Sequence, residues 1–265
     1  MTAFLSQRHT NAHPLFRVEL EQAAFNHGFR KANGIADGWF YFRSDEGVPG
    51  EVALASGTGA DGSPWFLAVE HAGVAQKLCE ELAAAMVGPA PGHLRAAFAF
   101  ATQAELRAAL SRAFHLARSL PSFPFAQWEA EVSHLGDTDV ERIVKQRVGQ
   151  SYFRRALLDF WGSRCPLTHI SEEAMLRASH IVPWAHCQSD EERLDVHNGL
   201  LLAAHWDAAF DRGLASFDDE GRPLLRPDID PVVAALLSPA NVQPLALAPE
   251  HRRQLAWHRR HFGFL

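Results

Sequence analysis

The sequence predicts an α+β protein that is divided into two domains, and three observations support this prediction. Segments rich in aromatic or aliphatic residues alternate with Gly, Asp and Pro turns over residues 38–70, as expected for a small sheet. Capping boxes begin at Thr102 and at Thr138, each with a Glu three residues later, and each predicts the start of a helix. Between these helices, residues 119–125 contain two prolines that interrupt the helical pattern.

The N-terminal half is expected to form an α/β module. Apolar residues four positions apart predict a first helix over residues 15–32. Strands are then predicted over residues 38–44, 51–56 and 64–70, followed by a helix over 72–86. We place the first domain at residues 1–125, a linker at 126–137 and the second domain at 138–265.

In the C-terminal half, the acidic turn over residues 218–221 predicts a hairpin, because Gly221 can supply a positive φ. A last helix is predicted from Pro249 to His261. The chain has 265 residues, of which 47% are hydrophobic, and this is enough for two separate cores.

The net charge of −6 is unfavourable for DNA binding, which depends on Lys and Arg neutralising phosphates. The basic residues are clustered, however, so a basic surface can exist on an acidic protein. The two clusters contain Arg142, Lys145, Arg147, Arg154, Arg155 and Arg164, and then Arg252, Arg253, Arg259 and Arg260.

The cysteines Cys79, Cys165 and Cys187 form no C-x-x-C pair, so no structural zinc is expected. An odd number of cysteines, together with no signal-peptide pattern and no long apolar run, predicts a cytoplasmic protein without a membrane contact.

The most informative segment of the chain covers residues 177–213. His180 lies in a strand-like stretch that Pro183 ends, and a histidine suits general-base catalysis because its ordinary pKa is about 6.5. Asn198 stands at the entry to a second buried strand, where its amide is expected to orient His180 or to touch a metal ion. Asp207 and Asp211 follow on one face of a helix and are candidate ligands for a divalent cation.

These residues resemble the HNH endonucleases, whose catalytic element is the ββα-metal finger. The shared tokens are Ser179-His180-Ile181-Val182-Pro183-Trp184, Arg193-Leu194-Asp195, Asn198-Gly199-Leu200 and Phe210-Asp211-Arg212-Gly213, in a pattern that is similar to the restriction-type subfamily. The resemblance extends from about Thr138 to the C-terminus. One departure is Ser179, because many family members have an Asp metal ligand immediately before the first His.

By this resemblance, His180 is the general base, Asn198 the middle residue and Asp207 the last metal-binding residue, with His205 as a second choice. Asn198 and Asp211 complete the expected metal ligands, and the expected ion is Mg²⁺ or Mn²⁺. Arg154, Arg155 and Arg212 are expected to contact DNA.

The function that follows is a restriction-type DNA endonuclease that acts on foreign or modified double-stranded DNA. Cleavage of both strands predicts a homodimer, and nicking by a monomer is the alternative. A homing or mobile-element nuclease, a toxin nuclease and a catalytically decayed DNA-binding protein are the alternatives.

The N-terminal domain is expected to recognise DNA sequence or base modification. Trp39, Tyr41, Trp65 and Phe66 are candidates to line a pocket for a flipped base. The favoured interpretation is that these aromatic residues fill the core.

Overall fold

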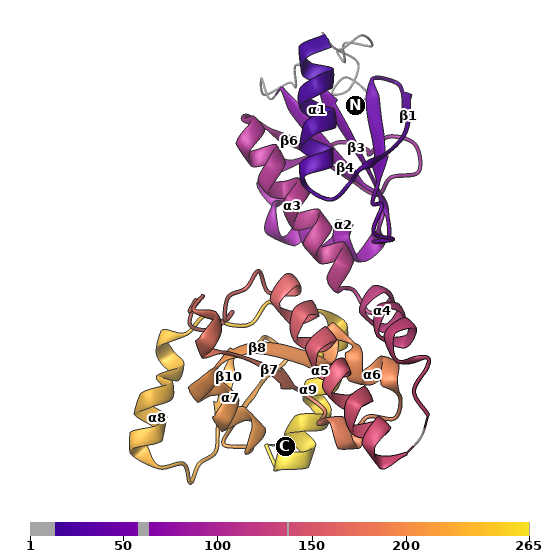
Figure 1. Cartoon of the computed structure of the whole chain (residues 1–265). Coiled ribbons are helices and arrows are strands. Elements are labelled where there is room, and N and C mark those ends of the chain that lie inside the picture. Colours follow the sequence, from indigo (N-terminus) through magenta and orange to yellow (C-terminus); the bar gives the residue numbers. More distant parts are fainter. Residues whose placement is uncertain (1–13, 58–63, 137, 265) are drawn as a thin grey trace. The chain divides into compact units, whose positions relative to one another are not determined.

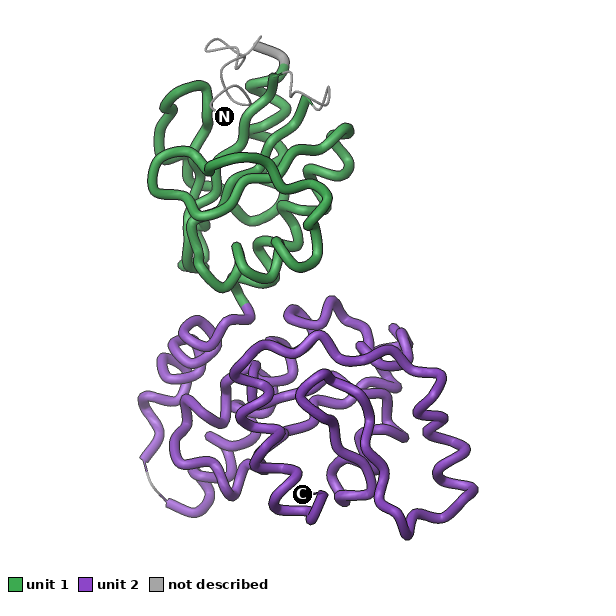
Figure 2. Tube along the Cα trace, turned by 180° about the vertical axis from the view of Figure 1, so that it is seen from behind, with its two compact units in different colours: residues 1–118 green, residues 119–265 purple. Residues whose placement is uncertain are grey.

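The computed structural model describes residues 14–57, 64–136 and 138–264, and it confirms an α+β protein (Figure 1). The chain forms two compact units, Met1–Arg118 and Ser119–Leu265 (Figure 2). Both capping boxes are present: the backbone N–H of Glu105 donates to Thr102 Oγ1, and that of Glu141 donates to Thr138 Oγ1.

The first unit is built on a six-stranded antiparallel sheet in the order β1-β2-β3-β4-β6-β5. The strands are β1 (Lys31–Ala36), β2 (Trp39–Arg43), β3 (Glu51–Ser56), β4 (Trp65–Val69), β5 (Met86–Val87) and β6 (Ala96–Phe100). The three predicted strands correspond to β2, β3 and β4. The other strands were not predicted. The first predicted helix, residues 15–32, ends early at Asn26, and β1 includes its last two predicted residues.

The helices of this unit are α1 (Pro14–Asn26), α2 (Ala72–Glu81) and α3 (Gln103–Ser119), with a 3₁₀ turn η1 (Ala83–Ala85) before β5. Leu54, Leu67 and Phe98 are paired across neighbouring strands and are fully buried. Figure 1 shows α1 and α3 lying across the sheet. Gly28, with φ +88°, makes the turn that ends α1 early, and a Cβ there would overlap the ring of Phe114.

The aromatic residues proposed for a base pocket belong mainly to the core of this unit. Trp39, Trp65 and Phe66 are only 0%, 8% and 2% exposed. Tyr41 is half-buried and stacks on His93, with ring centroids 6.2 Å apart. The interpretation that the aromatic residues fill the core therefore holds for Trp39, Trp65 and Phe66.

The second unit consists mainly of helices around two small antiparallel hairpins. Its helices are α4 (Ser122–Val132), α5 (Asp139–Phe160), α6 (Asp190–Leu194), α7 (Ala204–Asp211), α8 (Pro231–Leu237) and α9 (Pro249–Phe262). Strand β7 (Leu176–His180) pairs with β8 (Gly199–Ala203), and β9 (Ala215–Phe217) pairs with β10 (Pro223–Leu225). Short 3₁₀ turns are η2 (Glu173–Met175), η3 (Trp184–His186), η4 (Val196–Asn198) and η5 (Pro239–Asn241).

The boundary between the units differs from the expected linker at residues 126–137. Most of that segment is helix α4, which packs against α5. Trp128 of α4 is buried, and its indole N–H donates to the Lys145 carbonyl at 3.2 Å. Pro121 and Pro124 do not break α4, because they lie at its N-cap and in its first turn, where backbone N–H groups have no partner within the helix.

Candidate active site

Strands β7 and β8 and helix α7 form a compact ββα element in the second unit. The hairpin pairs Ser179 with Leu200 and His180 with Gly199. All five residues of β8 are buried, and the chain passes directly from Ala203 at the end of β8 to Ala204 at the start of α7. Helix α7 packs against both strands, while α5 packs against them as well. The three predicted segments of the motif are therefore brought together.

His180 is half-buried at the end of β7. Its ring stacks on Phe153 of α5, with centroids 3.8 Å apart and an interplanar angle of 14°. Because the Arg193 carbonyl is an acceptor only, the contact of 2.9 Å places the proton on His180 Nε2. Among the described residues, Nδ1 has no hydrogen-bond partner, so its lone pair is available.

The electrostatics of this position favour the neutral imidazole. Burial lowers the pKa of His180 to about 4, and the hydrogen bond to the Arg193 carbonyl only partly opposes this shift. The ring is therefore neutral near pH 7, which is the state that a general base requires.

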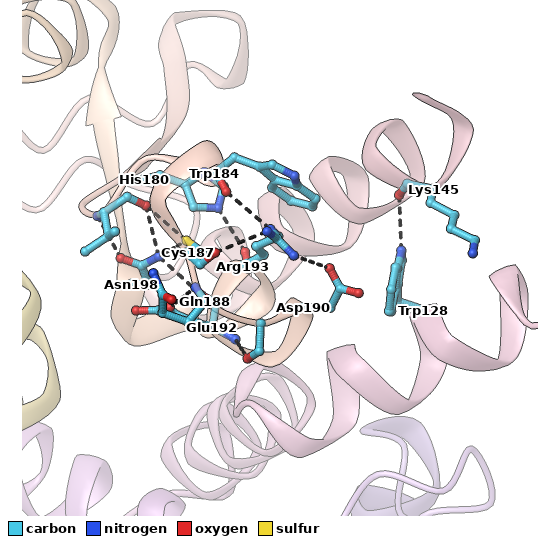
Figure 3. Close-up of polar contacts among 12 residues, drawn as sticks. Trp128, Lys145, His180, Trp184, Cys187, Gln188, Asp190, Glu192, Arg193 and Asn198 are labelled. Atoms are coloured by element: carbon cyan, nitrogen blue, oxygen red, sulfur yellow. Dashed lines mark hydrogen bonds and ion pairs between the residues drawn. The ribbon is translucent and has the colours of Figure 1, made fainter. Parts of the chain in front are cut away.

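Asn198 lies at the end of the loop that joins β7 to β8. Its side chain is fully buried, and Oδ1 accepts from the Val182 N–H at 2.8 Å. Nδ2 donates to the carbonyls of Val182 and Glu192, each at 3.2 Å, and contacts Cys187 Sγ at 3.3 Å (Figure 3). The amide thus closes the loop between the two strands, because all of these contacts are made to residues of that loop.

Asp207 lies beside Ser179, whose buried hydroxyl donates to Asp207 Oδ1. Asp211 follows one turn later on α7, and its pKa is raised by partial burial and by the negative charge of Asp207. His205 is two residues before Asp207, so its side chain points about 200° away around the helix. The two aspartates, rather than His205, share a face.

The chemistry of these donors fits a hard divalent cation. Carboxylate oxygens are the ligands that Mg²⁺ and Mn²⁺ prefer, and the mutual repulsion of Asp207 and Asp211 is relieved by a positive charge. Within residues 14–57, 64–136 and 138–264, no group of three or more His, Cys, Asp and Glu side chains forms a metal site. Two carboxylates would leave the other coordination positions to water and phosphate oxygens.

The three arginines expected to contact DNA lie in different surroundings. Arg154 donates to the carbonyls of Leu176 and Glu173 at 3.0 and 3.2 Å, so its guanidinium holds the start of β7. Arg155 is exposed and lies over the Tyr152 ring at 5.2 Å. Arg212 is exposed at the C-cap of α7.

Two residues that support the site were not assigned a role from the sequence. Phe153 stacks on the His180 ring. Buried Gly149, Phe153 and Leu157 are four residues apart on α5, and this helical spacing predicts a buried face. Arg193 belongs to a shared token of the motif, but nothing in its spacing indicated which groups it binds.

A comparison with models of protein families finds a match in the second unit. The model of the HNH endonuclease family matches residues 165–218, which include β7, β8 and α7. A search of curated proteins found no match to the chain. Of the helices in the described segments, none has the length and apolar content to cross a membrane. Residues 165–218 of this chain form a domain of the HNH endonuclease family.

Proposed function

We propose that the protein is a metal-dependent DNA endonuclease of restriction type, which cleaves foreign or modified double-stranded DNA. The observation that carries this proposal is the state of His180. Its Nε2 proton is held by a backbone carbonyl and its pKa is lowered to about 4, so that Nδ1 is a free base near neutral pH.

In this proposal, His180 Nδ1 takes the proton from the attacking water molecule. Asp207 and Asp211 hold Mg²⁺ or Mn²⁺, and Ser179 orients Asp207 through its hydrogen bond. The bound cation supplies positive charge that stabilises the phosphate and the leaving 3′ oxygen. Arg155 and Arg212 contact DNA phosphates, and the products carry 5′ phosphate and 3′ hydroxyl ends.

The first unit is proposed to restrict where the HNH domain cuts, by recognition of DNA sequence or base modification. Phosphate contacts alone carry no sequence information, so a nuclease domain of this kind needs a source of specificity. Cleavage of both strands is proposed to involve a homodimer, because a two-fold symmetric pair presents one active site to each strand.

The test compares the wild type with His180→Ala on methylated and unmethylated plasmids, with Mg²⁺, Mn²⁺ or EDTA. Loss of a general base is expected to lower the cleavage rate by about 10²- to 10⁴-fold. His134→Ala is the matched control, because His134 is exposed in the turn after α4. Cleavage at the wild-type rate by His180→Ala, or undiminished cleavage in EDTA, would overturn the proposal.

A second candidate, a DNA-binding protein without nuclease activity, is favoured by one observation. Ser179 occupies the place where many family members have an Asp ligand, and it has a neutral hydroxyl. If the wild type binds DNA but does not cleave it under any of these conditions, while Ser179→Asp cleaves, this second candidate is correct.

A further inference from the structure

We propose that Arg193 is a positioning residue that fixes the orientation and the tautomer of His180, an inference that rests on the proposed role of His180 as the general base. Arg193 does so in two ways. Its carbonyl binds the imidazole, and its guanidinium immobilises the loop that bears this carbonyl.

The carbonyl of Arg193 is available because of its place in a short helix. Helix α6 has only five residues, and the carbonyls of the last turn of a helix have no N–H partner within it. The Arg193 carbonyl is one of these, and it accepts from His180 Nε2 at 2.9 Å. A backbone carbonyl cannot donate, so this contact selects the tautomer that has its free lone pair on Nδ1.

The guanidinium of Arg193 holds the loop at three points (Figure 3). Nε donates to the Trp184 carbonyl at 3.2 Å, Nη2 donates to the Cys187 carbonyl at 3.1 Å, and Nη1 pairs with Asp190 at 2.7 Å. The guanidinium carbon also lies 5.7 Å from the centre of the Trp184 ring. Three acceptors in different directions match the rigid fork of an Arg, whereas the single ammonium of a Lys cannot reproduce the same arrangement.

A second constraint acts on the neighbouring peptide. Asn198 Nδ2 donates to the carbonyl of Glu192, the residue immediately before Arg193. The Arg193 peptide is therefore held from one side by Asn198 and from the other by its own side chain. Trp184, which Arg193 contacts, also touches the His180 ring edge-on with centroids 5.7 Å apart. Movement of this loop would displace two of the groups that orient the imidazole.

A loop arginine with a purely structural role would affect stability but not the state of His180. The distinguishing measurements are kcat against KM for plasmid cleavage and the ¹⁵N NMR shifts of the His180 ring in protein labelled with ¹⁵N-histidine. The His180 signals are identified by their loss in His180→Ala. The wild type is expected to show the Nε2–H tautomer.

The variants are Arg193→Gln and Arg193→Lys, with Arg226→Gln as the matched control. Arg226 is a suitable control because it forms an exposed ion pair with Asp228 after β10. For Arg193→Gln we expect kcat to fall by about 10²-fold, the effect of a displacement of about 1 Å in an active site. KM is expected to stay within about twofold, because substrate binding is not altered. The ¹⁵N shifts are expected to show a mixture of tautomers, and Arg193→Lys is expected to recover only a small part of the loss.

If Arg193→Gln does not fold, Asp190→Ala removes one contact of the guanidinium from a half-buried position, and Asp228→Ala is its control. A fall in kcat and a change in the ¹⁵N shifts in Asp190→Ala would then support the inference. Wild-type kcat and a pure Nε2–H tautomer in the folded Arg193 variants, or in Asp190→Ala, would overturn it. His180→Ala in the same assay separates the two ways of failing. If His180→Ala is inactive, only the inference about Arg193 has failed; if His180→Ala cleaves normally, the proposed function itself has failed.

Discussion

Gly199 permits the close approach of α5 to the hairpin, and this makes Gly199→Ala a sensitive test of how His180 is held. The φ of Gly199 is −151°, an extended conformation that Ala adopts without strain, so the effect of the substitution is steric. A Cβ at this position would lie 2.4 Å from Phe153 Cζ and 3.0 Å from both terminal methyl carbons of Leu157.

The size of the expected effect follows from these distances. Carbon atoms in contact are separated by about 3.5–4.0 Å, so the Phe153 ring or the β8 backbone has to move by about 1 Å. Such overpacking costs about 1–3 kcal/mol of unfolding free energy. Because the Phe153 ring is stacked on His180 at 3.8 Å, the same movement displaces the imidazole, and we expect kcat to fall by about 10²-fold.

The assay is urea unfolding combined with plasmid cleavage. Gly88→Ala is the control, since a Cβ at Gly88 meets open space. The double variant Gly199→Ala/Phe153→Leu removes ring atoms from the point of overlap, and it is expected to show a coupling free energy of about 1 kcal/mol with recovered packing. Wild-type stability together with wild-type kcat in Gly199→Ala would refute the conclusion that Phe153 holds His180.

Three further predictions concern other parts of the second unit. Asn198→Asp removes both N–H donors of the side-chain amide and buries a charge, so we expect the free energy of unfolding, measured in urea, to fall by about 3 kcal/mol or more. An unchanged free energy of unfolding would contradict the role of Asn198 in closing the loop. Burial lowers the pKa of His180 and of His258 to about 4, from an ordinary 6.5. Between these two pH values the unfolded state binds more protons than the folded state, so the free energy of unfolding falls as the pH is lowered from 6.5 to 4. For His258, which is 1% exposed, the full loss of unfolding free energy over this pH range is about 3 kcal/mol. A urea midpoint that rises on acidification would contradict this prediction, as would a pH dependence of stability that His258→Gln does not reduce. Arg154→Gln is expected to lose about 1–2 kcal/mol of unfolding free energy. Arg155→Gln is expected to keep the wild-type stability and to lower the salt dependence of DNA affinity, measured by anisotropy titration, by about one charge. The opposite pattern would reverse the two assignments.

The parts of the fold that could be predicted are those whose signals are local. The strands β2, β3 and β4 are short apolar segments between turn residues, and the capping boxes mark α3 and α5 directly. Strand β1 has no such signal, since all six of its residues are exposed and Gly34 has φ +112°. It is a strand because it pairs with β2, and pairing of this kind is not encoded in a short window of sequence.

The candidate site shows the same division between local and tertiary information. The residue types and their order predicted the hairpin and the following helix, because an HNH motif is short and contiguous. The partners of Asn198, Arg154 and Arg193 could not be predicted, since they are mainly backbone carbonyls, which every residue possesses. The prolines of residues 119–125 correctly indicated that α3 ends at Ser119, but helix α4 was not predicted, because the effect of a proline depends on its position in the helix.

The uninterrupted passage from β8 into α7 has a consequence for how the domain tolerates insertions. No residue separates Ala203 from Ala204, so one extra residue within β8 would exchange the two faces of the strand and rotate α7 by about 100°. Either change would carry Asp207 away from Ser179. Changes in chain length, whether natural or engineered, are therefore expected to be accepted in the exposed segments between β10 and α9 and to be rejected throughout residues 199–211.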